Sequence, residues 1–146
     1  MIANKKGLTL IELVLVSFMV SLFFLLTFPM NNKLHDRYLL TSTAKEIRST
    51  LYLAQQMSMD ESRDYGVELF QESYRIRDQI FNGKILHREK IDDRIKVMPG
   101  NSPRITYNRH GNTSYGYFVL SNRQGEKIKI EAMIGTGKIK ISNIYK

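Results

Sequence analysis

The chain is 146 residues long, contains no cysteine and carries a formal net charge of +8 with its three histidines counted as neutral. The absence of cysteine excludes disulfide bonds, thiol redox chemistry and cysteine-ligated metal sites. The basic balance favours anionic partners such as nucleic acid or a membrane surface. The length is sufficient for one domain with its own hydrophobic core.

The first predicted element is a helix over Leu8–Met30, an apolar run in which Glu12 is the only charged residue. A helix of this length is long enough to cross a bilayer core of about 30 Å. A carboxylate inside such a helix is costly, which indicates a functional role with an oppositely charged partner. Lys5 and Lys6 precede the run and predict a cytoplasmic N-terminus, with residues 31–146 outside the cell membrane.

The residues at the start of this run resemble a known signal. The run lacks the small-residue cleavage site that follows a secretory signal, whereas Gly7 directly precedes it. Lys6-Gly7 followed by Leu8-Thr9-Leu10-Ile11-Glu12 resembles the signal of type IV prepilins and pseudopilins. The resemblance implies a leader over residues 1–7, cleavage of the Gly7–Leu8 bond by a prepilin peptidase, and N-methylation of Leu8. It also makes Glu12 the assembly glutamate and Pro29 a helix-kinking proline, although Leu8 stands where the family most often has Phe.

The chemistry of Glu12 agrees with a role in assembly. When a subunit docks into a bundle of such helices, an N-terminal ammonium and a carboxylate meet in apolar surroundings, where each charge is costly without the other. The alternative is an ordinary membrane anchor whose Glu12 reaches back to the lipid head groups. The spacing of Gly7, Glu12 and the apolar run favours assembly.

The rest of the sequence predicts one α+β domain over residues 31–146. Apolar residues recur at intervals of three and four from Leu40 to Met57, which predicts an amphipathic helix over about Asn32–Met59 that covers a sheet. Beyond it the period changes to two, and Asn82-Gly83 indicates a hairpin. The predicted strands are Tyr65–Phe70, Ser73–Arg77, Lys84–Arg88, Arg94–Met98, Arg104–Tyr107, Tyr115–Ser121, Lys127–Met133 and Lys138–Ser142. A helix followed by antiparallel strands is an α+β layout.

The strand region extends the resemblance over nearly the whole chain. Arg104–Gly111, the strand through Gly116, and the closing Gly135-Thr136-Gly137-Lys138 strand resemble the H-type minor pseudopilins, and among them the ComGD-like competence pseudopilins. The resemblance implies the type IV pilin-like fold, in which a long N-terminal helix, first transmembrane and then amphipathic, packs on a C-terminal antiparallel sheet. It implies a minor subunit of a transformation pilus, at the cell surface after assembly, that helps to capture and transport extracellular DNA. The implied partners are other competence pseudopilins, the prepilin peptidase, an assembly ATPase with its platform protein, the membrane and double-stranded DNA.

Two other functions stay open at this point. A minor pseudopilin of a type II secretion or general type IV pilus system would share the same N-terminal signal. A membrane-tethered DNA-binding protein outside any filament would keep its leader. Enzyme activity and a cofactor are not expected, because His35, His87 and His110 lack metal-ligand spacing and no nucleotide-binding or hydrolase motif is present.

The basic residues concentrate toward the C-terminus. Removal of Lys5 and Lys6 with the leader would lower the formal side-chain charge from +8 to +6. Arg109, Arg123, Lys138 and Lys140 are the candidate phosphate contacts if the late basic residues gather on one face. Alternating lysines also suit the solvent face of half-buried strands, where they discourage edge aggregation, and we favour that interpretation.

Overall fold

The computed structural model describes residues 9–27, 31–79 and 83–146. The chain divides into two compact units, Met1–Leu34 and His35–Lys146. The elements in chain order are α1 (Leu10–Thr27), α2 (Asn31–Asp60), β1 (Tyr65–Leu69), β2 (Ser73–Asp78), β3 (Ile85–Lys90), β4 (Lys96–Val97), β5 (Arg104–Tyr107), β6 (Gly116–Ser121), β7 (Lys127–Ala132) and β8 (Ile139–Ile141). This order of helix and strands confirms the predicted α+β class.

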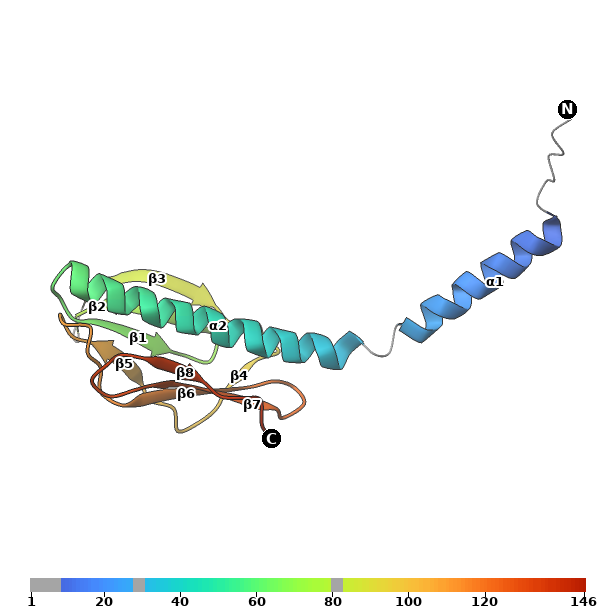
Figure 1. Cartoon of the computed structure of the whole chain (residues 1–146). Coiled ribbons are helices and arrows are strands. Elements are labelled where there is room, and N and C mark those ends of the chain that lie inside the picture. Colours follow the sequence, from blue (N-terminus) through green and yellow to red (C-terminus); the bar gives the residue numbers. More distant parts are fainter. Residues whose placement is uncertain (1–8, 28–30, 80–82) are drawn as a thin grey trace, which may run out of the picture. The chain divides into compact units, whose positions relative to one another are not determined.

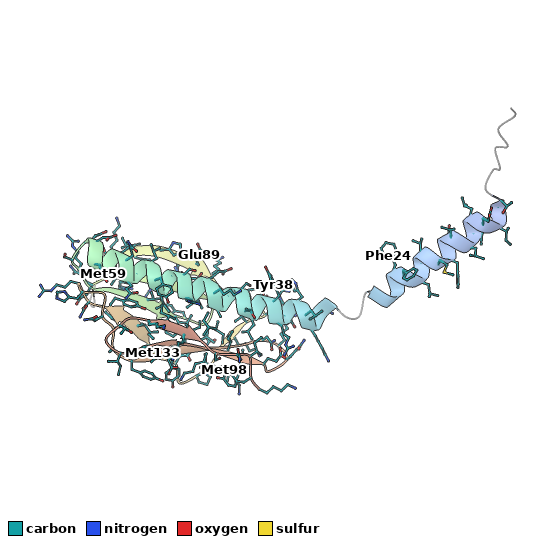
Figure 2. All side chains as sticks on the ribbon, in the orientation of Figure 1. Phe24, Tyr38, Met59, Glu89, Met98 and Met133 are labelled. Atoms are coloured by element: carbon teal, nitrogen blue, oxygen red, sulfur yellow. The ribbon has the colours of Figure 1, made fainter. Side chains whose placement is uncertain are left out.

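The first unit contains α1, whose large apolar side chains from Leu10 to Phe24 are exposed, Phe24 among them (Figure 2). The predicted run Leu8–Met30 extends beyond the described residues at both ends, and Pro29 lies outside them. In the described part of the chain, no helix combines the length and the apolar character that crossing a membrane requires.

In the second unit, α2 supplies one side of the hydrophobic core. Leu40, Ala44, Ile47, Leu51 and Ala54 are fully buried, and their spacing of three and four residues places them on one face of the helix. This confirms the predicted amphipathic helix almost to the residue. Figure 1 shows α2 lying lengthwise along the strands.

The strands form two four-stranded antiparallel sheets rather than one. The first sheet has the order β3-β2-β1-β5 and the second has the order β4-β6-β7-β8. The side chains that face the core from the first sheet are Tyr65, Val67, Tyr74, Ile76, Ile105 and Tyr107, and those from the second are Phe118, Leu120, Ile128, Ile130, Ala132 and Ile139. Both sheets therefore bury one face against a shared core and leave the other face outward.

The observed strands follow the predicted ones closely, with β4 as the main difference. Its predicted range, Arg94–Met98, shrinks to Lys96–Val97 because Asp92 builds a turn before it. The Asp92 carboxylate accepts hydrogen bonds from the backbone N–H of Arg94 at 3.0 Å and from the Arg94 guanidinium at 2.9 and 2.8 Å. An Asx turn of this kind competes with the extended backbone. The β2–β3 pairing confirms the predicted hairpin, although Asn82 lies outside the described residues.

Candidate functional site

The N-terminal signal is described from Thr9 onward, so Gly7 and Leu8 lie outside the described residues and the predicted cleavage stays a prediction. Thr9 and Glu12 form a capping box at the start of α1. The backbone N–H and the hydroxyl of Thr9 each donate to Glu12 Oε2 at 2.9 Å, and the Glu12 N–H donates to Thr9 Oγ1 at 3.4 Å. This pairing satisfies N–H groups that the first turn of a helix otherwise leaves without a partner.

The capping box and the predicted assembly role are compatible. Both residues follow the Gly7–Leu8 bond, so cleavage there would keep them in the mature chain. The two bonds from Thr9 use only one oxygen of Glu12, and an ionised carboxylate has about four acceptor sites. Glu12 can therefore cap its own helix and still pair with an ammonium group.

Two of the predicted DNA contacts, Arg109 and Lys138, lie in loops that meet at the C-terminal end of α2. Gln55 joins these loops, because its side-chain amide donates to Gly111 O at 2.8 Å and to Thr136 O at 3.4 Å. Met59, at the same end of the helix (Figure 2), lies against Gly111. Lys140 follows on β8, directly opposite Glu131 of β7.

Arg123 lies at the other end of the domain. It belongs to the β6–β7 turn, where Glu126 pairs with Arg37 of α2 at 2.9 Å. Arg37 and Gln55 are about 27 Å apart along α2, since a helix rises about 1.5 Å per residue. The four predicted residues therefore do not form one patch, and their contact with DNA stays a prediction.

The densest group of charges was not predicted from the sequence. Glu68 of β1 is buried and accepts hydrogen bonds from Arg75 of β2, at 2.5 Å, and from Arg104 of β5. Arg77 Nε lies 3.4 Å from the same carboxylate. Burial raises the pKa of Glu68, but the hydrogen bonds from Arg75 and Arg104 outweigh it and lower the pKa overall. The carboxylate is therefore ionised at neutral pH.

The sequence did carry a signal for this group of charges, namely the alternation of core-facing and outward-facing residues along each strand. Glu68 and Arg75 each sit between core-facing residues, and Arg77 and Arg104 each adjoin one, Ile76 and Ile105, so all four side chains point to the outer face. The missing information was strand order, because β1 and β5 are far apart in sequence and pair directly.

A second outward cluster occupies the other sheet. The Tyr115 hydroxyl donates to Glu131 at 2.6 Å, Lys129 pairs with the same carboxylate at 3.0 Å, and the Tyr117 hydroxyl donates to Gly100 O at 2.9 Å. Lys129 Nζ also lies 4.7 Å from the centre of the Tyr117 ring. Hydrogen bonds from Tyr115 and Lys129 lower the pKa of Glu131. These contacts support a packing role for both tyrosines rather than base stacking.

Metal ligation has no support within residues 9–27, 31–79 and 83–146, where no group of three or more His, Asp or Glu side chains could hold an ion. Gly135 and Gly137 both have positive φ, 79° and 62°, which suits the predicted tight turn.

No protein-family model matches the sequence, and no curated protein matches it either. Solved structures do match. The minor pseudopilin EpsH from the Type 2 Secretion System of Vibrio cholerae aligns with a TM-score of 0.57 and 10% identity, over 70% of this chain and 95% of EpsH. The type IV minor pilin FimU of Pseudomonas aeruginosa aligns with a TM-score of 0.60 and 13% identity, over 73% of this chain and 90% of FimU. The chain therefore has the type IV pilin-like fold that these minor pilins and pseudopilins share.

Proposed function

We propose that this chain is a minor pseudopilin that assembles with other pilin-like subunits into a filament. The observation that carries this proposal is the combination of a pilin-like fold with the Lys6-Gly7-Leu8 signal and Glu12 at the start of α1. Prepilin peptidase would cut after Gly7 and methylate Leu8. Its role is structural, and no enzymatic chemistry is assigned to it.

We further propose that the filament is a competence pilus and that the chain is its ComGD-like subunit. The support is the resemblance of the strand region, from Arg104 to Lys138, to ComGD-like pseudopilins. The net positive charge of the chain adds to it, because it suits a partner that carries phosphates. The precursor would cross the cell membrane once through the apolar run, with its N-terminus in the cytoplasm. Its partners would be the other competence pseudopilins, and it would depend on the assembly ATPase and the platform protein.

A type II secretion or general type IV pilus system is the second candidate. It is favoured by the named structural neighbours, since EpsH belongs to a Type 2 Secretion System and FimU is a type IV minor pilin. Deletion of the gene separates the two candidates. Loss of transformation with normal protein secretion supports the competence pilus, and the reverse supports secretion.

The capping box allows a sharp test of filament assembly. Glu12→Gln removes the charge but keeps an amide that can complete the box, whereas Thr9→Ala weakens the box and keeps the charge. We expect E12Q to lose co-purification with partner pseudopilins and T9A to retain it. The measurement is recovery of the tagged subunit in sheared filaments, with total membrane-bound protein as the control. Recovery of E12Q at the level of the parent chain would contradict the assembly role.

A further inference from the structure

The outer face of the β3-β2-β1-β5 sheet carries a row of arginines that the proposed function does not yet use. Arg88, Arg75, Glu68 and Arg104 lie directly opposite one another on β3, β2, β1 and β5. Residues that pair directly in antiparallel strands share a face of the sheet. Arg77 lies two residues from Arg75 and therefore on the same side. We call Arg75, Arg77, Arg88 and Arg104 the arginine face.

This face points away from the core. Glu89, the neighbour of Arg88 on β3, lines a hollow together with Lys45 and Glu46 of α2, and Figure 2 shows it beside the helix. Because side chains alternate along a strand, Arg88 points the opposite way, and it is exposed.

The sheet is built to let Arg104 lie across it. A Cβ at Gly66 of β1 would come within 2.6 Å of Arg104 Cδ, so the absence of a side chain there makes room for the arginine stem. On the neighbouring strand, the guanidinium of Arg75 lies 4.5 Å from the centre of the Phe70 ring. Arg75 and Arg104 are thus held in place by packing as well as by Glu68.

The charges on this face do not balance. Arg75, Arg77 and Arg104 surround one carboxylate, Glu68, and Arg88 adds a fourth positive charge in the same row. Arg77 Nη1 donates to Gly83 O at 3.3 Å, but Arg77 Nε is buried and has no hydrogen-bond partner among the described residues, because its 3.4 Å approach to Glu68 does not make a hydrogen bond. One carboxylate does not neutralise four guanidinium groups, so this face carries a net positive charge that can attract a negatively charged ligand.

A hollow of about 620 Å³ continues the basic surface at the Arg88 end. Arg88, Lys90 and Lys96 line it, with Glu72 and Asp93 as the acidic residues. Asp93 lies 4.0 Å from Arg123, so one residue of the predicted late basic group approaches this surface.

We infer that the arginine face and the adjoining Lys90 bind the phosphate backbone of double-stranded DNA. This inference rests on the proposed competence role, which brings the chain to extracellular DNA. The four strands, each about 4.8 Å from the next, space the backbone positions of this row over about 14 Å, so the face is wide enough to meet more than one phosphate of a duplex. Fixed, planar guanidinium groups suit hydrogen bonding to phosphate, whereas binding to an anionic lipid surface usually relies on flexible basic segments or amphipathic helices. The contact would have no sequence preference, because it uses phosphates alone.

The test compares two double variants of the full chain, each of which removes two positive charges. Arg88→Gln with Lys90→Gln alters the proposed site at exposed positions, and Lys138→Gln with Lys140→Gln alters the competing late basic residues at exposed positions near and on β8. Binding of a labelled duplex of about 30 base pairs is measured by fluorescence anisotropy in a neutral detergent, between about 50 and 200 mM salt. We expect R88Q/K90Q to lower affinity about tenfold or more and to reduce the salt slope by about two, with a change of less than about twofold in K138Q/K140Q.

The inference would be overturned by no binding of the parent chain at low salt, by an equal loss in both double variants, or by a loss only in K138Q/K140Q. Vesicles of phosphatidylglycerol test the lipid alternative, and loss of vesicle binding by R88Q/K90Q with unchanged DNA binding would also overturn the inference.

Transformation assays separate this inference from the proposed competence role. If the gene is required for transformation and R88Q/K90Q binds DNA normally, the site is wrong and the competence role stands. If the gene is dispensable, the competence role fails whatever the titration shows.

Discussion

At the scale of single residues, Glu68 is the charge on which the outer face of the first sheet depends. Its carboxylate is 8% exposed and is the nearest negative group to Arg75, Arg77 and Arg104. Burying a carboxylate is costly, and here that cost is offset by hydrogen bonds from two guanidinium groups. The same arrangement leaves the arginines dependent on it, because without Glu68 they would repel one another.

Glu68→Gln should therefore destabilise the domain by about 2–3 kcal/mol at neutral pH, the range of a hydrogen bond to a charged group. The pKa of Glu68 is lowered in the folded chain and is about 4.3 when unfolded. A lowered pKa stabilises the fold above about pH 4.3, and that contribution is lost as the pH falls toward the folded value. The gap between parent and variant should thus be constant near pH 7 and narrow below about pH 4. Urea denaturation of the full chain in detergent measures it.

Glu131→Gln is the control for this prediction. Glu131 also lies on an outward sheet face, but its side chain is 29% exposed and its ion pair is with a single lysine, Lys129. We expect Glu131→Gln to lower the free energy of unfolding by less than about 1 kcal/mol. Equal losses in the two variants would mean that the arginine group does not depend on its carboxylate.

Glycine at position 137 gives a second prediction at the residue scale. Gly137 has φ of 62°, and a Cβ there would lie 2.2 Å from Gln55 Nε2, whereas Gly135 has φ of 79° with nothing near. Both Gly→Ala variants strain the backbone, but only Gly137→Ala displaces the amide that joins two loops. We expect G137A to lower the melting temperature more than G135A. The opposite order would show that Gln55 does not stabilise this end of the domain.

At the scale of elements, the end of α2 shows how a sequence can stop a helix without glycine. Ser62 follows the helix with φ of 54°, and the N–H of Arg63 donates to Ser58 O at 3.2 Å, as in a Schellman-type cap. Serine in this left-handed conformation costs about 1 kcal/mol relative to glycine. The charged sequence after α2 predicted a loop, and the cap accounts for its conformation.

Ser62→Gly should accordingly stabilise the domain by about 0.5–1 kcal/mol. Ser49 is the matched control, since it is exposed within α2 and Ser49→Gly should instead destabilise by about 0.5 kcal/mol. Thermal melts followed by circular dichroism measure both. A lower melting temperature for S62G would contradict the strain at position 62.

At the scale of the whole molecule, a helix and two sheets share one core, while the residues proposed for assembly lie in the other compact unit. This division suits a subunit whose N-terminal segment joins a filament, while the outward faces of its two sheets stay free to bind a partner. It also means that processing can be tested independently of the fold.

The mature chain should begin at Leu8 and carry a methylated α-amino group. Intact-mass measurement of the protein from peptidase-positive cells checks this, and Gly7→Glu is the control that should leave the precursor uncut. A chain that begins at Met1 or Ala3 in such cells would refute the processing and favour a membrane-tethered protein outside any filament.

The sequence by itself determined the features that depend on local patterns. Apolar residues spaced three and four apart predicted α2, and apolar residues at every second position predicted all eight strands. Turn residues such as Asn122 and Gly125 marked the ends of strands. The predicted N-terminal signal is likewise contiguous, so it could be proposed without a fold. The capping box of Thr9 and Glu12 is equally local, but it was not predicted from the sequence.

Only the tertiary structure decided which strands are neighbours and what gathers on their outer faces. The division into two sheets depends on packing against the shared core, which no local pattern encodes. For this reason the late basic residues, which all lie in the C-terminal part of the sequence, spread over both ends of the domain. Arg75 and Arg104, distant in sequence, meet at Glu68 because β1 pairs with both β2 and β5.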